Sequence, residues 1–250
     1  MLKQRKILAC VDQSPYADYV ADYAAWAARK LVLPLELLHI IDRHQETSAS
    51  TDHSGAIGVD AQENLLNQLT EEEGTRTRQV RDRGRVFLNG LRQRCEANEA
   101  ISVDTRQRYG QLLGTLEEQQ QDVALYVLGR RGESAAHTRR DLGRHVEMIS
   151  RQVRRPILTV AGEFVEPRSA LIAYDGKRMT RRCVELIAQN PKLNDIPVHV
   201  IMSGKRATDA DKHLQWAKDT LNTAGFTVET AYAPGDPEQE ITRAIGERQA

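Results

Sequence analysis

Two stretches of this chain repeat the same order of features, and this internal repeat limits the folds that the chain can adopt. In each copy a short apolar run ends at an aspartate, a helical pattern follows, and a proline precedes a second apolar run. The same spacing separates Asp12 from Pro34 and Asp175 from Pro197. A strand, a helix and a second strand in this order form a βαβ unit with a right-handed crossover. The repeat indicates two related small domains in tandem, which we place at 1–163 and 168–250.

The first copy consists of apolar, strand-like runs that alternate with helical patterns. The expected strands are Lys6–Val11, Leu35–Ile41, Ile101–Arg108, Val123–Leu128 and Ile157–Val160. The expected helices start at Ser14 and Pro15, as N-cap and first helical residue, and continue with Ala61–Ala97, Gln111–Gln121 and Leu142–Gln152. Gly84 and Gly90 are expected to bend or divide the long helix, and the Ser/Thr/Gly-rich segment Arg43–Asp60 is expected to be a loop. The alternation predicts an α/β fold with an open five-stranded parallel sheet and helices on both faces.

The second copy repeats only the first part of this pattern. Its expected strands are Ala170–Tyr174 and Val198–Met202, followed by a run that ends at Gly235 as the third strand region of the first copy ends at Gly110. Its expected helices are Met179–Asn190 and Glu238–Arg248, and Glu163–Arg168 joins the two copies. The fourth strand, the glycine-rich loop, the last helix and the fifth strand have no counterpart, so we expect an incomplete second domain.

Composition excludes several classes of protein. Lys+Arg and Asp+Glu both number 35, which argues against binding nucleic acid through bulk charge, although not against a local basic patch. Apolar runs have the length of strands and are too short to cross a membrane. The three cysteines are far apart, so free thiols in a cytoplasmic protein are expected. We find no metal-ligand spacing and no acid–His–nucleophile spacing around His137 or His145.

A glycine-rich loop follows the fourth expected strand. Gly129 and Gly132 come first, and Gly143 precedes the next helical pattern. Glycines after a buried strand and before a helix let backbone N–H groups approach a phosphate closely. A tight turn without a ligand would use the same glycines, and the many arginines around the loop are either a solvated surface or an anion-binding patch.

Together with the repeat, five features make the chain similar to a known family. It resembles a tandem universal stress protein in Val11-Asp12-Gln13-Ser14, in the LLHII run that ends at Ile41, in Gly110, in the Gly129-x-x-Gly132 loop with Gly143, and in the terminal run Arg155–Val160. The resemblance implies an adenine-nucleotide-binding type of parallel sheet. It also implies a cytoplasmic protein of the stress response that is dimeric or tandem.

The resemblance further implies an ATP site, with Mg, in the first domain. Asp12, Ile40 and Ile41 match the nucleotide side of the sheet, and the phosphate side would comprise Gly129, Arg130, Gly132, Gly143 and Arg144. This chain departs from the family pattern twice, because the spacer Glu133–Leu142 is one residue longer and Arg144 replaces a small hydroxyl residue. Arg144 either pairs with the phosphate or fills its place and blocks it, and the joint change favours the second account.

Two functions are compatible with these residues. One is a sensor or regulator that binds an adenine nucleotide, and the alternative is an interaction scaffold of the same family without nucleotide. No catalytic constellation is evident, and slow ATP hydrolysis is the most that we expect. We also expect the two copies to pair through their fifth-strand regions as an intramolecular pseudo-dimer, or the chain to self-associate.

Overall fold

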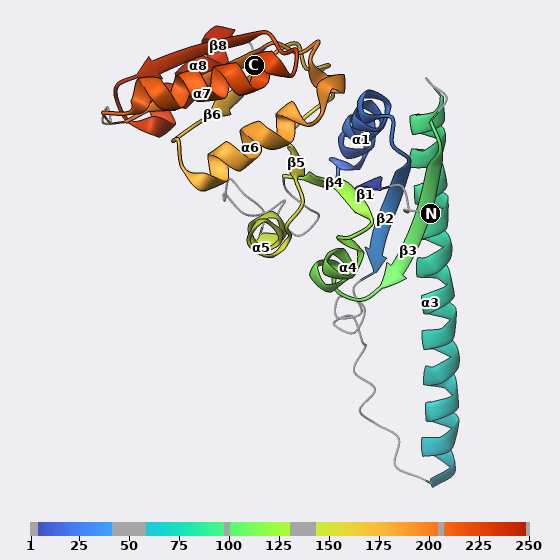
Figure 1. Cartoon of the computed structure of the whole chain (residues 1–250). Helices are drawn as coiled ribbons and strands as arrows, with labels where there is room; N and C mark the ends of the chain where they lie inside the picture. Colours follow the sequence, from blue (N-terminus) through green and yellow to red (C-terminus); the bar gives the residue numbers. More distant parts are fainter. Residues whose placement is uncertain (1–4, 42–58, 98–100, 131–143, 205–207, 249–250) are drawn as a thin grey trace. The chain divides into compact units, whose positions relative to one another are not determined.

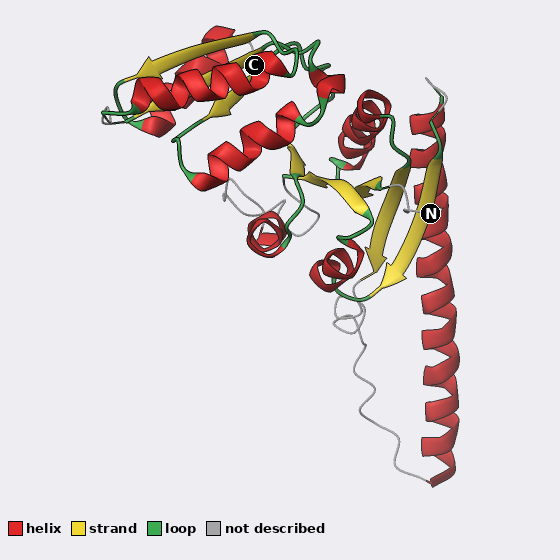
Figure 2. Cartoon of the chain, in the orientation of Figure 1, coloured by secondary structure: helices red, strands yellow, loops and turns green. Residues whose placement is uncertain are grey.

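The computed structural model divides into two compact units, Met1–Phe164 and Val165–Ala250. It describes residues 5–41, 59–97, 101–130, 144–204 and 208–248, with the backbone alone for 59–73, 144–145 and 248. The predicted glycine loop after Arg130 and most of the predicted loop Arg43–Asp60 lie outside these residues. Both units alternate strands and helices (Figures 1 and 2).

The first unit contains the predicted five-stranded parallel sheet. Its strands are β1 (Lys6–Cys10), β2 (Leu35–Ile41), β3 (Val103–Tyr109), β4 (Val123–Gly129) and β5 (Ile157–Val160). They lie in the order β3-β2-β1-β4-β5. All pairs are parallel, and β1, between β2 and β4, pairs Cys10 with Leu38 on one side and with Leu128 on the other. The fold class predicted for this domain is therefore confirmed.

Helices cover both faces of this sheet. They are α1 (Ala17–Leu31), α3 (Val59–Glu96), α4 (Leu112–Gln119) and α5 (Arg144–Gln152). α1 and α3 pack on one face, where Ala24 and Leu91 join Ile7 of β1 in one apolar cluster. α4 and α5 pack on the other face, where Leu116 and Ile149 join a second cluster around β1, β2 and β4. Apolar side chains that alternate between two covered faces explain why β1, β2 and β4 appear in the sequence as continuous apolar runs.

Several predicted boundaries differ from the structure. α1 starts at Ala17 rather than at Ser14, because Ser14 belongs to a turn in which its hydroxyl accepts the Tyr16 N–H at 3.3 Å and its carbonyl accepts the Ala17 N–H at 3.1 Å. The last two residues of the predicted loop Arg43–Asp60 belong to α3. The structure does not divide α3 at its glycines. A Cβ at Gly84 would lie 2.2 Å from Gln107 Nε2, so this glycine permits close packing of α3 against β3.

The second unit repeats the first half of this arrangement. Its elements are β6 (Ala170–Ala173), α6 (Arg178–Ala188), the short 3-10 helix η2 (Pro191–Leu193), β7 (Val198–Ser203), α7 (Ala210–Thr223), β8 (Val228–Ala233) and α8 (Pro237–Arg248). The three strands are parallel in the order β6-β7-β8, which repeats the order β1-β2-β3. α6 and α7 cover one face through Val184 and Leu214, and α8 packs on the other through Ala244. This three-stranded sheet agrees with the predicted incomplete copy.

Candidate functional site

The chain changes from one side of β1 to the other between β3 and β4, while all strands stay parallel. The chain leaves β1 towards β2 and β3 and later returns to β4 on the opposite side of β1. In open α/β sheets, ligands bind at such a point, outside the carboxyl ends of the strands. β1 ends at Cys10, two residues before Asp12, and β4 ends at Gly129. Asp12 and Gly129 therefore lie at the ends of neighbouring strands, at the same edge of the sheet. The topology thus brings two of the predicted site residues to one place.

Asp12 lies in the turn between β1 and α1. Its side chain is partly exposed, and Oδ1 accepts a hydrogen bond from the Ser14 N–H at 3.2 Å. Because α1 begins only at Ala17, four residues separate Asp12 from the helix.

Ile40 and Ile41 end β2 beside this turn. Ile40 is partly buried against the cluster under α4 and α5, whereas Ile41 is buried. The Ile41 carbonyl accepts the Gly110 N–H at 3.1 Å, and Gly110 has a positive φ of 135°. Gly110 therefore makes a turn that side chains rarely permit, and this turn closes the carboxyl end of the β2–β3 pair.

The phosphate side of the predicted site is described only in part. Gly129 pairs with Val160, and the Arg130 N–H donates to the Val160 carbonyl at 2.7 Å. Gly132 and Gly143 lie outside the described residues, and Arg144 is the first residue of α5 with its backbone alone described. The role of the glycine loop and of Arg144 therefore stays a prediction.

The second copy places Asp175 in a tighter turn than Asp12. Its Oδ1 accepts hydrogen bonds from the Lys177 N–H at 2.9 Å and from the Thr180 hydroxyl at 2.6 Å. α6 starts at Arg178, so only Gly176 and Lys177 separate the aspartate from the helix. The Thr180 hydroxyl and then the Lys177 amide lower the pKa of Asp175 below its ordinary value of 3.8. Asp175 is thus held by local hydrogen bonds in the turn before α6, whose N-cap is Lys177.

Replacing Thr180 with alanine is expected to raise the pKa of Asp175 towards its ordinary value. The folded-state pKa lies below the unfolded one, so the carboxylate stabilises the second unit above the unfolded pKa, and this contribution disappears as the pH falls through the folded pKa. Titration of the Asp175 carboxyl carbon by NMR measures the change. Thr180→Ser keeps the hydroxyl and should keep the low pKa. An unchanged pKa in Thr180→Ala would contradict this assignment.

Sequence reasoning missed a packed cluster at the carboxyl end of β6. The Arg181 guanidinium lies 4.7 Å from the centre of the Trp216 ring, and its Nη2 lies 2.9 Å from His213 Nδ1. Arginine offers only donors, so Nδ1 accepts and the ring proton lies on Nε2. A Cβ at Gly176 would lie 2.8 Å from the His213 ring, so protein atoms pack tightly here. These residues come from the turn after β6, from α6 and from α7, and no local spacing could have grouped them.

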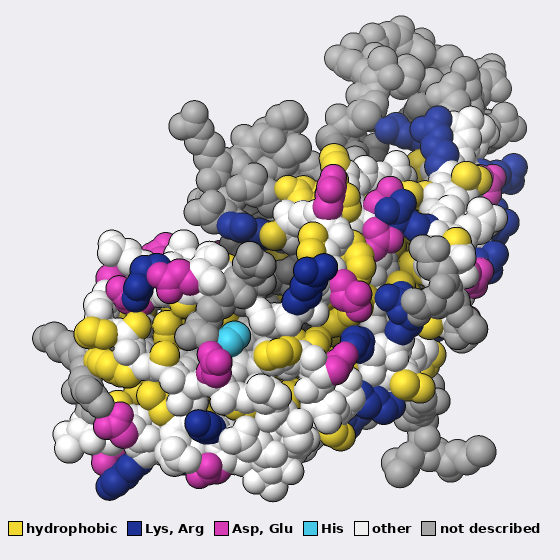
Figure 3. Space-filling model, turned by 90° about the horizontal axis from the view of Figure 1, so that it is seen from above, with side chains coloured by type: hydrophobic (Ala, Val, Ile, Leu, Met, Phe, Trp, Pro, Cys, Tyr) yellow, Lys and Arg dark blue, Asp and Glu magenta, His cyan; other side chains and the backbone are white. Residues whose placement is uncertain are grey.

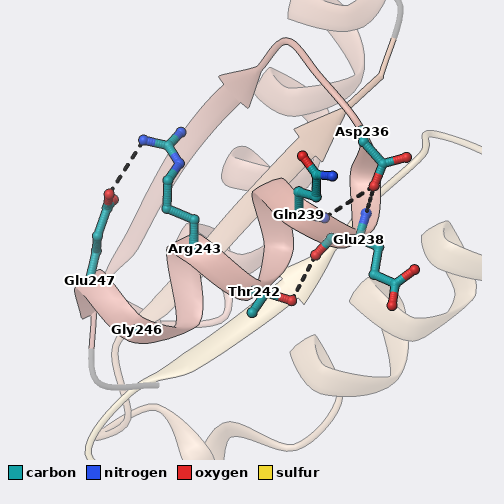
Figure 4. Close-up of a pocket in the computed structure, with 7 residues that line it drawn as sticks. All are labelled: Asp236, Glu238, Gln239, Thr242, Arg243, Gly246 and Glu247. Atoms are coloured by element: carbon teal, nitrogen blue, oxygen red, sulfur yellow. Dashed lines mark hydrogen bonds and ion pairs between the residues drawn. The ribbon is translucent and has the colours of Figure 1, made fainter.

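A shallow hollow of about 920 Å³ lies along α8 (Figure 4). Its side chains bond mainly to their own helix: Asp236 Oδ1 accepts the N–H groups of Glu238 and Gln239, and the Arg243 guanidinium lies 3.3 Å from Glu247. These are capping and one-turn contacts that a solvated helix makes by itself. The hollow therefore offers no built polar site, and all of its lining residues belong to the second unit.

The described residues contain no group of three His, Cys, Asp or Glu side chains placed to hold a metal ion. Cys10, Cys95 and Cys183 are free thiols. Burial, and then the nearby Glu36, raises the pKa of Cys10, so this thiol keeps its proton near neutral pH. Among the described residues no helix is both long and apolar enough to cross a membrane.

Comparison with known proteins gives consistent matches. The sequence profile of the Universal stress protein family matches residues 3–161. A universal stress protein of Synechocystis sp. is 32% identical over 242 residues, which cover 96% of this chain and 84% of the relative. The crystal structure of a universal stress protein from Archaeoglobus fulgidus has a TM-score of 0.66 at 17% identity and covers 98% of this chain and 84% of that one. This structural match supports the fold across both units.

Proposed function

The chain belongs to the universal stress protein family, and from this we propose that its first unit binds an adenine nucleotide at the edge between β1 and β4. Binding there would let the protein act as a sensor or regulator in the stress response. The observation that carries the proposal is the position of Asp12, just after β1, and of Gly129, at the end of β4. These neighbouring strands lie where the chain changes from one side of β1 to the other.

The two aspartates of the repeat differ in a way that supports the first unit rather than the second. Four residues separate Asp12 from α1, whereas only two separate Asp175 from α6, where Asp175 accepts the Thr180 hydroxyl. The described part of the second unit also has no strand on the far side of β6, where β4 lies beside β1. Among the described residues, only the first unit therefore has strands on both sides of its first strand, as a binding site at such a point requires.

Calorimetric titration with ATP and Mg tests the proposal. We expect Asp12→Ala to weaken binding by the contribution of a hydrogen bond to a charged group, about 1.5–3 kcal/mol, because the carboxylate would accept from the ribose hydroxyls. Asp175→Ala is the matched control, since it changes the equivalent residue of the second copy, and it should leave binding unchanged. Asp12→Asn keeps an acceptor for the Ser14 N–H and serves if the alanine variant fails to fold. No heat of binding in any of the proteins would leave the scaffold function as the better account.

The role of Arg144 determines whether the site can bind the phosphates of ATP. If its side chain pairs with the phosphate, Arg144→Ala should weaken ATP binding by about 1.5–3 kcal/mol. If it blocks the phosphate position, Arg144→Ser combined with removal of one residue from Glu133–Leu142 should create binding that the unaltered chain lacks. Calorimetry on the three proteins separates these accounts, and equal ATP affinity in all three would contradict both. Slow hydrolysis, cytoplasmic location and pairing of the copies stay predictions.

A further inference from the structure

An exposed stretch of α3 carries an unusual concentration of arginines. All five of them are exposed, and Asp82 is the only acidic residue in the same stretch; the arginines are Arg76, Arg78, Arg81, Arg83 and Arg85. α3 continues past the end of β3 in Figure 1, and Gly84 packs against Gln107 near that end. The N-terminal part of α3 therefore extends beyond the sheet. Figure 3 shows the molecule from above the view of Figure 1, and on that face Lys and Arg side chains alternate with Asp and Glu.

Most of these arginines lack an acidic partner among the described residues. Among the described side chains, Arg81 Nε lies 4.0 Å from Asp82 Oδ1, and both of these side chains are more than half exposed. Arg94, further along the same helix, binds Asp22 at 2.7 and 2.9 Å and lies 3.4 Å from Asp18. The helix thus pairs Arg94 where acids are within reach, whereas among the described side chains the basic stretch has only the contact of Arg81 with Asp82.

The helical period arranges the basic stretch in two rows. Arg76 and Arg83 lie two turns apart on one side of α3, about 10.5 Å along its axis. Arg78 and Arg85 lie equally far apart on the other side, with Arg81 between them. Like charges three and four residues apart destabilise a helix, so these arginines repel one another in the free protein. A partner with many closely spaced negative charges would remove this repulsion.

The chemistry of the stretch favours a phosphate backbone over an acidic protein. The guanidinium fork matches phosphate in two parallel hydrogen bonds, and every cationic side chain between Lys30 and Lys177 is arginine. Protein partners usually need an apolar centre that charged residues avoid. Val86 is the only strongly exposed large apolar residue along this part of α3. Interfaces with nucleic acid are polar and positively charged, as this one is.

We propose that the exposed stretch of α3 from Arg76 to Arg85 binds the phosphate backbone of nucleic acid without sequence preference. This stretch belongs to α3, which packs against the edge strand β3, whereas the proposed nucleotide site lies between β1 and β4. A neutral chain with one local basic patch binds weakly and loses affinity steeply with salt, because each neutralised phosphate releases a counterion. The patch is therefore compatible with the zero net charge of the whole chain.

Fluorescence anisotropy with a labelled mixed-sequence DNA duplex tests this proposal on the full chain, between about 50 and about 200 mM salt. A labelled single-stranded RNA serves as a second probe, and a poly-glutamate peptide represents an acidic protein. The test variant combines Arg78→Gln, Arg81→Gln and Arg85→Gln. The matched control combines Arg151→Gln, Arg178→Gln and Arg182→Gln, which removes the same charge from other exposed positions. Circular dichroism checks that each variant is folded.

We expect the unaltered chain to bind at low salt and the test variant to lose at least about tenfold in affinity. The slope of log affinity against log salt should also become less steep by about 2 to 3, or roughly 0.9 per lost contact with a duplex. The control variant should keep both affinity and slope. Preference for the DNA or the RNA probe would identify the source of the phosphates. Absence of binding, equal loss in both variants, or tighter binding of poly-glutamate than of either nucleic acid would overturn the proposal.

Discussion

Replacing Lys6 with alanine is expected to lower the free energy of unfolding of the first unit by about 3–5 kcal/mol. Lys6 Nζ donates to Glu36 Oε2 at 2.8 Å and to Gln119 Oε1 at 2.9 Å. The Glu36 side chain is only 7% exposed, and Arg106 Nη2 lies 3.4 Å from the same carboxylate oxygen. Without Lys6, a buried carboxylate would keep only this longer contact to a half-exposed arginine. The loss comes from the uncompensated charge rather than from the strength of the pair.

Urea unfolding followed by tryptophan fluorescence measures this effect. Trp26 lies in the first unit and Trp216 in the second, so a Trp216→Phe background confines the signal to the first unit. Arg108→Ala is the control, because its pair with Glu118 is exposed and should contribute no more than about 1 kcal/mol. Replacing the pair together, as Lys6→Met with Glu36→Leu, should restore much of the loss. If Lys6→Ala lowers the free energy of unfolding no more than Arg108→Ala does, the inferred contribution of the buried pair is wrong.

Replacing Tyr126 with alanine is expected to cost about 3–5 kcal/mol in the same assay. The side chain is fully buried in the cluster under α4 and α5, and its hydroxyl donates to the Leu116 carbonyl at 2.7 Å. That carbonyl belongs to the last turn of α4, where the helix offers no partner of its own. Burial raises the pKa of Tyr126, so the phenol keeps its proton and can donate over the whole neutral range.

Tyr126→Phe separates the two contributions of this side chain. It keeps the ring but leaves the buried Leu116 carbonyl unpaired, which should cost about 1–3 kcal/mol. Tyr109→Ala, at the partly exposed end of β3, should change stability by about 0.5 kcal/mol or less. Equal losses in Tyr126→Phe and Tyr126→Ala would mean that the hydroxyl contact alone, and not the ring, stabilises this region.

The strands were predictable because their signal is local. A parallel strand covered on both faces is a continuous apolar run, and the predicted bounds of β2 and β5 agree with the structure. The prediction failed where hydrogen bonds between residues close in sequence compete with the helix. The turn around Ser14 delays the start of α1 to Ala17. The repeat also did not lead us to assign α7, which takes the place of α3 between the second and third strands of its copy but has 14 residues where α3 has 38.

The candidate site was predictable for a related reason. Parallel strands end at one edge of their sheet, so residues that follow apolar runs gather there, as Asp12 and Gly129 do. The order of strands, which makes β1 and β4 neighbours, follows from crossovers that no local pattern specifies. The sequence suggested this order only through the family that it resembles.

By itself, then, the sequence determined the strands, the repeat and the aspartate of each copy, because these depend on residues close together in the chain. The tertiary structure alone decided which distant polar groups meet. Lys6 contacts Glu36 and Gln119, which are 30 and 113 residues away, and neither contact has a spacing that marks it. It also decided that, among the described side chains, the exposed arginines near Gly84 have one acidic contact, that of Arg81 with Asp82 at 4.0 Å. Polar side chains become buried and paired only when the sheet and its helices assemble. The free energy of a charged side chain depends on these surroundings far more than on its neighbours in sequence.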